Sequence, residues 1–190
     1  MLLDESHELI RDTARRFASE QLAPFAARRD REGEFPAEAV REMGELGFLG
    51  MTIPAEYDGA GADHLALVLA LEEIAWGDAS ISTTMSGHNS VGCMPVYKFG
   101  TEAQKAQYLK PMARGEMLSA FCLTEPKGGS DAGNPLTRAR KSGDKYILNG
   151  TKQFITNGST AQLAIVFAAT DPDAGRKGIT AFLEKQKISW

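Results

Sequence analysis

Apolar side chains recur at helical spacing through about the first 115 residues of the chain. Leu9, Ile10, Phe17 and Leu22, with charged residues between them, predict a helix over residues 3–27. The same spacing, read together with capping and stop signals, predicts four more helices. These are residues 36–46, ended by Gly47; residues 64–77, capped by Asp63 and largely buried; residues 80–99, broken near Gly92 or Pro95; and residues 101–109, ended before Pro111.

After Gly115 the pattern changes to the two-residue period of β-strands. The pair Asn149-Gly150 is the strongest hairpin signal, because both residue types accept the positive φ of a tight turn. We therefore expect an α+β fold: an all-α N-terminal helical domain over residues 1–117, then a partial antiparallel β-barrel or sandwich domain over residues 118–190, which is incomplete. The predicted strands are residues 118–124, 136–140, 145–148, 152–156, 163–169 and 178–183.

Composition and charge narrow the possible partners. The chain has 190 residues, 43% hydrophobic and 24% charged, with a net charge of -4. Without a basic face it is not expected to bind nucleic acid. Cys93 and Cys122 lack a CxxC or metal-ligand spacing, so we expect reduced thiols. The N-terminus shows no signal peptide, and the longest apolar run, residues 65–71, is too short to span a membrane, which predicts a cytoplasmic protein.

The stretch from Phe121 to Ala132 has the residue order of a binding loop at the end of a strand. Pro126 stops an apolar run, Gly128 and Gly129 allow close approach of the backbone to a ligand, and Ser130 supplies a hydroxyl group. A surface loop without a ligand does not need this order of residues. We therefore treat this stretch as a candidate ligand-binding loop.

A second stretch, residues 154–158, carries an aromatic and a hydroxyl side chain at the end of another predicted strand. Phe121 with Thr124, and Phe154 with Thr156, have the chemistry of an apolar platform with a hydrogen-bonding rim. Such a platform suits a flat heteroaromatic cofactor. An ordinary sheet face with surface threonines has the same spacing, so spacing alone leaves both interpretations open.

The remaining motifs do not predict a nucleotide-binding or metal-binding site. The run from Gly59 to His64 lacks the third glycine of a dinucleotide-binding fingerprint, so a turn and helix cap is favoured. His7, His64 and His88 are too scattered to predict a metal site. Among them, only His88 lies among residues small enough for it to face a ligand, and a buried or capping histidine is the alternative.

Motifs along the whole chain, in a consistent order, support a family resemblance. The specific ones are Ala120-Phe-Cys-Leu-Thr-Glu-Pro-Lys-Gly-Gly-Ser-Asp-Ala132 and Lys152-Gln-Phe-Ile-Thr-Asn-Gly158. Supporting ones are residues 53–59, 99–105, 146–150 and 177–182. With these motifs the chain resembles the acyl-CoA dehydrogenases. The resemblance implies a helical N-terminal domain and a middle β-domain that bind FAD and an acyl-CoA, and hence an FAD-dependent α,β-dehydrogenation.

The resemblance also implies site residues. Thr124 would hydrogen-bond the pyrimidine side of the flavin, Thr156 would lie near its N5 side, and Ser130 would touch both the cofactor phosphates and the acyl-CoA. Phe154 stands where the family often has tryptophan, so the aromatic wall is narrower. The implied FAD contacts are Phe121, Leu123, Thr124, Gly129, Ser130, Phe154, Ile155 and Thr156, and the implied substrate contacts are Ser130, Thr83, Thr84 and Gly87.

In the family a C-terminal helical domain with the catalytic glutamate follows, whereas this chain stops at Trp190. We therefore expect a truncated dehydrogenase and assign no catalytic residue; Glu125 is the tempting substitute, but Pro126 fixes it beside a turn. The implied partners are an acyl-CoA substrate, the electron-transferring flavoprotein as acceptor and, at full length, further copies in a tetramer. The alternatives are a noncatalytic remnant or subunit that binds flavin or CoA, and an acyl-CoA oxidase or flavin monooxygenase of the same fold.

Overall fold

The structure is a computed structural model that describes residues 3–170. These residues form two compact units: a helical unit of residues 3–120 with 156–163, and a strand unit of residues 121–155 with 164–170. The helices and the unclosed two-stranded sheets confirm the predicted α+β fold. The predicted strand over residues 178–183 lies outside the described residues. The predicted domain boundary after residue 117 stays a prediction.

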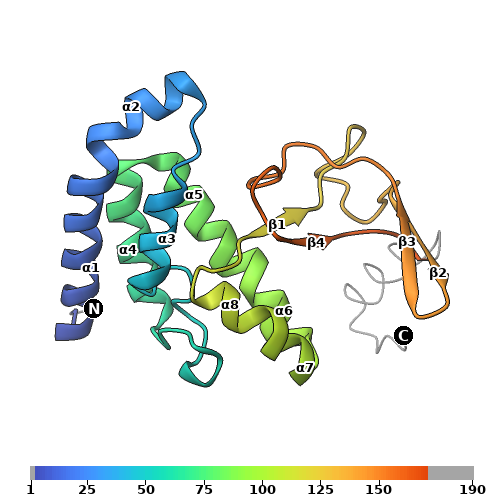
Figure 1. Ribbon diagram of the computed structural model, residues 1–190, viewed down its shortest axis with the longest axis horizontal. Coiled ribbons are helices and arrows are strands. Elements are labelled where there is room, and N and C mark those ends of the chain that lie inside the picture. Colours follow the sequence, from blue (N-terminus) through green and yellow to red (C-terminus); the bar gives the residue numbers. More distant parts are fainter. Residues whose placement is uncertain (1–2, 171–190) are drawn as a thin grey trace. The chain divides into compact units, whose positions relative to one another are not determined.

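The helical unit consists of helices that short π-helical segments and one 3-10 turn extend or connect. In it, α1 packs along α4 (Figure 1). The bounds are α1 (Glu5–Phe17), η1 (Ala18–Leu22), α2 (Ala23–Glu32), α3 (Ala37–Glu45), η2 (Ala55–Tyr57), α4 (His64–Gly77), α5 (Ala79–Gly87), η3 (His88–Cys93), α6 (Met94–Phe99), α7 (Glu102–Gln104), η4 (Lys105–Leu109) and α8 (Lys110–Ala113).

The predicted start and stop signals were correct at several helix ends. Asp63 caps α4, since its carboxylate accepts a hydrogen bond from the Ala66 N–H at 2.8 Å. Thr101 caps α7 in a reciprocal capping box with Gln104. The predicted end of the first helix at residue 27 is wrong, because η1 and α2 continue it to Glu32. It ends where Gly33 takes the left-handed conformation, with φ of 64°.

Prolines lie inside three of these helices without breaking them. Pro24, Pro95 and Pro111 each stand two residues after the last residue of a π-helical segment. A proline lacks an N–H, and its ring presses on the carbonyl four residues before it. In each helix that carbonyl belongs to the wider π-helical turn, where hydrogen bonds run to the fifth residue. The predicted break near Gly92 or Pro95 and the predicted end before Pro111 are therefore wrong.

Burial of α4 differs from the prediction. Val68 is 57% exposed and Trp76 is 69% exposed, so one face of this apolar helix is open rather than buried. Only the opposite face contributes to the core of the helical unit, through Ala66, Ala70 and Ile74. Other elements contribute further residues to the same core, including Phe17, Leu22, Val40, Met43, Phe48, Leu49, Ile81 and Met85.

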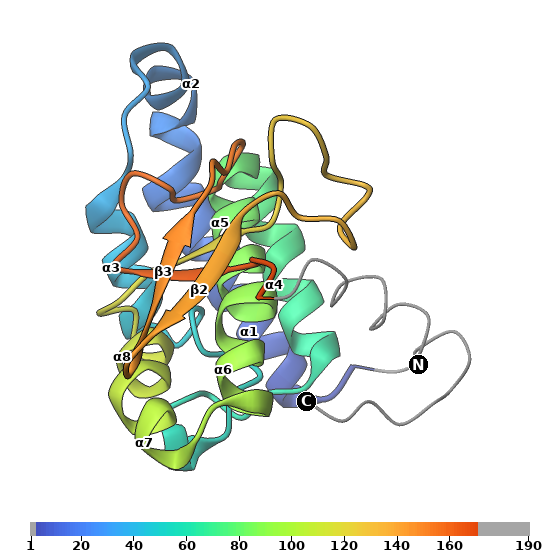
Figure 2. The same cartoon turned by 90° about the vertical axis from the view of Figure 1, so that its right-hand side faces the viewer.

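In the strand unit, β2 (Arg138–Ser142) and β3 (Lys145–Asn149) form an antiparallel ribbon, paired from Arg138 with Asn149 to Ser142 with Lys145 (Figure 2). Gly143, with φ of 63°, makes its turn. The hairpin predicted at Asn149-Gly150 is wrong, because neither residue has a positive φ. Gly150 instead approaches Thr137 so closely that a Cβ would stand 2.3 Å from the threonine hydroxyl oxygen.

The other two strands are β1 (Ser119–Cys122) and β4 (Leu163–Val166), which pair with each other. Beyond β4, the Ala169 N–H donates to Thr137, and the Ala139 N–H donates back to Ala169, both at 2.9 Å. This contact is parallel, whereas the sequence pattern predicted antiparallel pairing throughout. The predicted strand over residues 152–156 is wrong, because that segment is irregular. None of the described helices is long and apolar enough to cross a membrane.

Candidate functional site

A tight turn follows the end of β1 in the strand unit. The Glu125 N–H donates to the Gly128 carbonyl at 2.8 Å, and the Gly128 N–H donates back to the Glu125 carbonyl at 3.1 Å. Pro126 occupies the second position of this turn, where its fixed φ is favourable. The apolar strand end is therefore separated from the glycine and serine positions by a rigid corner, which confirms the stop predicted at Pro126.

At Gly129 the backbone lies close to Thr124, which follows the end of β1. A Cβ at this position would lie 3.3 Å from Cγ2 of Thr124, closer than side chains ordinarily pack, and 3.5 Å from the hydroxyl oxygen of the same residue. At Gly128 the nearest atom to such a Cβ would be 3.9 Å away. Of the two glycines, only Gly129 thus serves a close approach, and the group it approaches is half-buried Thr124.

Lys152 joins the two stretches that the sequence singled out. Its ammonium group donates to the Leu123 carbonyl at 2.9 Å and to the Glu125 carboxylate at 2.8 Å. The next residue, Gln153, donates its N–H to the Thr124 carbonyl at 3.0 Å. Residues 123–125 and 152–153 therefore lie side by side, although 27 positions separate Glu125 from Lys152 in the sequence.

Phe154 follows these contacts with an unusual backbone. Its φ is 57°, a left-handed value that bulky residues rarely adopt, and its side chain is 86% exposed. Phe121 and Leu123 are half-buried, and the Phe121 ring packs edge-on against Phe167 with 5.1 Å between ring centroids. The strand unit thus presents the highly exposed Phe154 side chain one residue after Gln153, whose N–H binds the Thr124 carbonyl.

Glu125 is held as a carboxylate. It is 6% exposed, and burial by itself raises the pKa of this carboxyl group. The Lys152 ammonium and the amides of Leu136 and Thr137, at 2.6 and 2.9 Å, outweigh burial and lower the pKa to about 2. A carboxylate so fully engaged is a poor proton acceptor, so the geometry agrees with assigning Glu125 no role as a base.

The helical unit holds Thr156 and three of the residues implied for the substrate, Thr83, Thr84 and Gly87, whereas the exposed Ser130 lies in the strand unit. Asn157, with φ of 61°, donates from its side-chain amide to the Ser119 carbonyl at 3.2 Å and accepts from the Thr84 hydroxyl at 3.4 Å. The structure therefore ties the exposed Thr156 to α5 through its neighbour. Thr83 is exposed, and a Cβ on Gly87 would meet no atom within 4 Å. The side of α5 at Gly87 is thus open.

The structure decides between the two interpretations of His88. This side chain is completely buried, and one ring nitrogen, Nε2, bonds the Met112 carbonyl at 3.0 Å. The other, Nδ1, accepts from the N–H of Ser119 at 3.2 Å. Burial lowers the pKa of His88, so the neutral ring is favoured. His88 therefore connects η3 to β1 and does not face a ligand.

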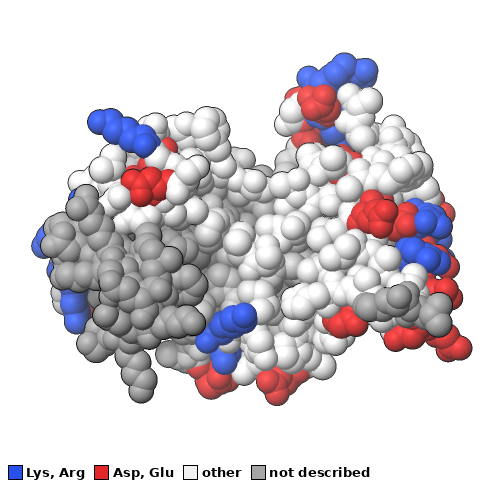
Figure 3. Space-filling view, turned by 180° about the vertical axis from the view of Figure 1, so that it is seen from behind, with Lys and Arg blue, Asp and Glu red and all other residues white. Residues whose placement is uncertain are grey.

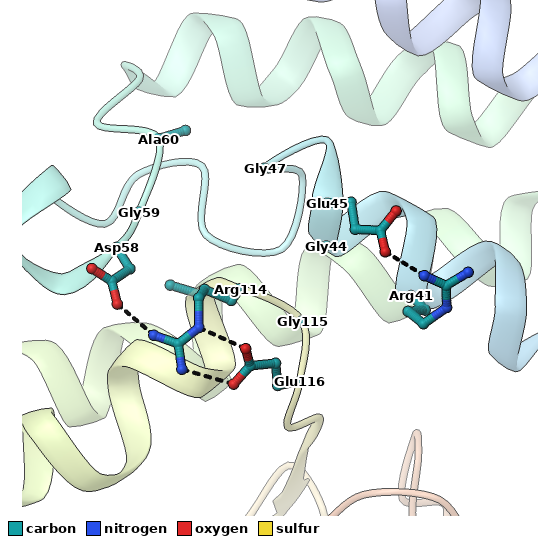
Figure 4. A pocket seen from close by; sticks show the side chains of 11 residues that line it. Arg41, Gly44, Glu45, Gly47, Asp58, Gly59, Ala60, Arg114, Gly115 and Glu116 are labelled. Atoms are coloured by element: carbon teal, nitrogen blue, oxygen red, sulfur yellow. Dashed lines mark hydrogen bonds and ion pairs between the residues drawn. The ribbon is translucent and has the colours of Figure 1, made fainter.

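A cavity of about 720 Å³ lies elsewhere in the helical unit, between α3, the loop at Asp58 and the end of α8 (Figure 4). Its charged side chains already have partners. Arg114 pairs with Glu116 and Asp58, which raise the pKa of the guanidinium group, and Arg41 pairs with Glu45. A charged ligand would have to break these pairs, so this cavity is a weaker candidate site.

Two family models match the chain, with the descriptions "Acyl-CoA dehydrogenase, N-terminal domain" over residues 4–116 and "Acyl-CoA dehydrogenase, middle domain" over residues 120–187. The chain belongs to the acyl-CoA dehydrogenase family. This membership confirms the resemblance that the motifs indicated.

Curated relatives agree with the family. The chain is 48% identical to the mitochondrial short-chain specific acyl-CoA dehydrogenase of Rattus norvegicus over 95% of this chain and 44% of the relative. It is also 48% identical to a 3-(aryl)acrylate reductase of Clostridium sporogenes, over 98% of this chain and 50% of the relative. The chain thus spans about half the length of these relatives.

Solved structures show the same fold. The butyryl-CoA dehydrogenase of Megasphaera elsdenii matches with a TM-score of 0.87 at 40% identity, over 92% of this chain and 47% of that one. A glutaryl-CoA dehydrogenase of Mycobacterium smegmatis in complex with FADH2 matches with a TM-score of 0.85 at 37% identity, over 89% and 44%. Both are dehydrogenases of acyl-CoA thioesters by their names.

The sequence did not predict that Lys152 and Asn157 connect separate segments of the chain by hydrogen bonds. The sequence pattern predicts Lys152 at the start of a strand, and an opposite charge 27 positions from Glu125 is too weak a signal to predict their contact. Asn157 carries a stronger signal, since asparagine before glycine favours a positive φ. The sequence pattern predicts only the end of a strand at this pair, and not the contacts of Asn157 with Ser119 and Thr84.

Proposed function

We propose that this protein binds FAD through the strand unit and serves the α,β-dehydrogenation of an acyl-CoA thioester. The observation that carries the proposal is the joining of residues 121–125 to residues 152–154 by Lys152 and Gln153. This contact brings a hydrogen-bonding strand end next to the exposed Phe154. Family membership and the relatives' names support the same chemistry.

The residues fit a flavin. Phe154 offers an exposed apolar ring, Thr124 a hydroxyl and backbone groups, and Gly129 a close-packed return of the chain. We infer that Phe121, Leu123, Ser130, Ile155 and Thr156 complete the contacts, as the family motifs imply. When bound, FAD would supply the acceptor of the substrate's β-hydride.

For the substrate we propose Ser130 together with Thr83, Thr84 and Gly87 of α5. The open space at Gly87 supports room for an acyl chain on that side of the helix. We assign no catalytic base among residues 3–170, since Glu125 is engaged by Lys152 and two amides. The role of these residues is to bind and orient the thioester.

The direct test is cofactor uptake by the purified chain. We expect a yellow protein, or one that quenches the fluorescence of added FAD in a saturable titration. Phe154→Ala should weaken binding about tenfold through lost ring contact. Phe99→Ala removes a comparably exposed ring from the helical unit, 85% against 86%, and should leave the affinity unchanged. A colourless protein that takes up no FAD contradicts the proposal.

The partners are proposed on family grounds. We infer that the electron-transferring flavoprotein reoxidises the bound cofactor and that the protein forms a homo-oligomer. Mass measured by size exclusion with light scattering tests the second point. Reduction of added electron-transferring flavoprotein during butyryl-CoA turnover tests the first, and oxygen consumption in its place would indicate an oxidase or a monooxygenase.

Two other functions have support of their own. The relative named 3-(aryl)acrylate reductase favours reduction of an activated double bond, which is dehydrogenation run backwards. Oxidation of the reduced flavoprotein by an arylacrylate, but not by crotonyl-CoA, would favour it. The engagement of Glu125 favours a flavin- or CoA-binding protein without turnover, and saturable binding of both ligands with no product would favour that one.

A further inference from the structure

Lys152 and Glu125 form an ion pair that is almost removed from solvent. The side chains are 11% and 5% exposed, and the nitrogen–oxygen distance is 2.8 Å. The same ammonium group binds the Leu123 carbonyl at 2.9 Å. The Glu125 carboxylate also accepts hydrogen bonds from the backbone N–H groups of Leu136 and Thr137. One charged pair therefore fastens three separate segments of the strand unit.

Stability alone is a weak reason for such a pair. Desolvating two charges offsets much of their attraction, and apolar side chains of similar size often stabilise a core as well. An apolar pair cannot bind a backbone carbonyl, however. What Lys152 adds is a fixed distance between its own backbone and the Leu123 carbonyl. Leu123 immediately precedes Thr124, and Lys152 stands two residues before Phe154.

We propose that Lys152 is a positioning residue for the cofactor: with Glu125 it fixes residues 123–125 against residues 152–154, and so sets Thr124 and Phe154 at the spacing that a flavin ring requires. The inference rests on the proposed FAD binding. Lys152 does not touch the ring in this account and acts through the two residues that do. Its loss loosens the site without removing any ring contact.

The test compares Lys152→Met with a matched control. Methionine keeps much of the side chain's length but has no charge and no N–H donor. Lys145→Met makes the same exchange at an exposed position of β3. Two measurements are made on each protein: hydrogen exchange of the Gln153 amide without cofactor, and FAD titration followed by fluorescence and visible circular dichroism.

We expect Lys152→Met to exchange the Gln153 amide at least about tenfold faster than the unsubstituted protein and to raise the Kd for FAD at least about tenfold. At saturating FAD its visible dichroism should also differ, because the ring sits differently. Lys145→Met should match the unsubstituted protein in all three. A role in stability alone would lower Tm and leave the saturated spectrum unchanged.

Unchanged Gln153 exchange in Lys152→Met would overturn the proposal. So would faster exchange combined with an unchanged FAD affinity and spectrum. If the unsubstituted protein takes up no FAD, the proposed function fails and with it the cofactor role of Lys152. The Gln153 exchange then still decides whether Lys152 holds the two segments together, so the two failures are distinguishable.

Discussion

At the scale of single residues, the backbone conformation and the exposure of Phe154 are both unfavourable for an aromatic residue. Phe154 holds a bulky aromatic side chain at a φ of 57° and exposes 86% of it. A left-handed conformation costs a residue other than glycine about 1–2 kcal/mol. An exposed phenyl ring gains no stabilisation from burial that could offset this cost in the free protein. Such strain at an exposed aromatic side chain indicates a function that requires the ring.

Replacing this residue should improve stability while harming binding. Phe154→Gly is expected to raise the free energy of unfolding by about 1 kcal/mol, because glycine accepts the left-handed backbone, and to weaken FAD binding. Urea unfolding and FAD titration measure the two effects. Tyr146→Gly, at an exposed strand position, should destabilise the protein instead. A loss of stability in Phe154→Gly would contradict the strain argument.

The two neighbouring glycines should respond differently to the same change. Gly129→Ala places a Cβ 3.3 Å from Thr124 and is expected to weaken FAD binding several-fold by displacing that residue. Gly128→Ala meets nothing nearer than 3.9 Å and serves as the matched control. Titration with FAD measures both. Equal affinities for the two variants would show that the close approach at Gly129 is irrelevant to the cofactor.

At the scale of elements, local sequence signals predicted where helices begin, but not that helices continue through internal prolines. Pro24, Pro95 and Pro111 all lie in helices that continue because a π-helical turn precedes each proline. Charged side chains gather toward one side of the helical unit, and uncharged surface adjoins them in the view from behind (Figure 3). Among the exposed apolar side chains of this unit are Val68 and Trp76 of α4.

The ribbon of β2 and β3 should depend on Gly143 alone for its turn. Gly143→Ala forces a Cβ into a backbone with φ of 63° and is expected to destabilise the strand unit by about 1 kcal/mol. Asn149→Ala is the control, because Asn149 does not form the turn and should change stability less. Urea unfolding followed by near-ultraviolet dichroism compares them. A larger loss of stability in Asn149→Ala would contradict the dependence of the turn on Gly143.

At the scale of the whole molecule, most charged side chains of the described residues are at the surface, and Lys152 and Glu125 form the ion pair among residues 3–170 in which both partners are least exposed. The chain carries a net charge of -4, yet the strand unit encloses Lys152 and Glu125 together. The pKa of Glu125 is lowered to about 2 from an ordinary value of 4.5. The pair therefore contributes stability above pH 4.5, and this contribution is lost as the pH falls toward 2.

Acid unfolding tests this directly. Glu125→Gln is expected to be less stable by about 3 kcal/mol at neutral pH, because Lys152 is left buried without its partner. The difference from the unsubstituted protein should shrink as the pH falls from 4.5 toward 2, because in this range the Glu125 carboxylate of the unfolded chain takes up a proton while the native carboxylate stays charged. Urea unfolding at several pH values measures it. A difference that stays constant down to pH 2 would contradict the lowered pKa of Glu125.

The family motifs gave candidate residues that the structure describes in two places. Phe121 to Ser130 with Phe154 and Ile155 fall in the strand unit, and Thr156 with Thr83, Thr84 and Gly87 falls in the helical unit. The roles assigned to them stay predictions. Period and capping signals located most helices and four strands, but they misplaced the hairpin, since a sequence cannot show that Gly150 is needed for contact with Thr137.

By itself the sequence determined the family, the succession of helices and strands, and the loop from Phe121 to Ala132, because these depend on residue order and local backbone preference. Only the tertiary structure decided that Lys152 joins this loop to Phe154, that Glu125 is an engaged carboxylate and that His88 is buried. The physical reason is that hydrogen bonding and desolvation between residues distant in the chain depend on which groups folding brings within about 3 Å.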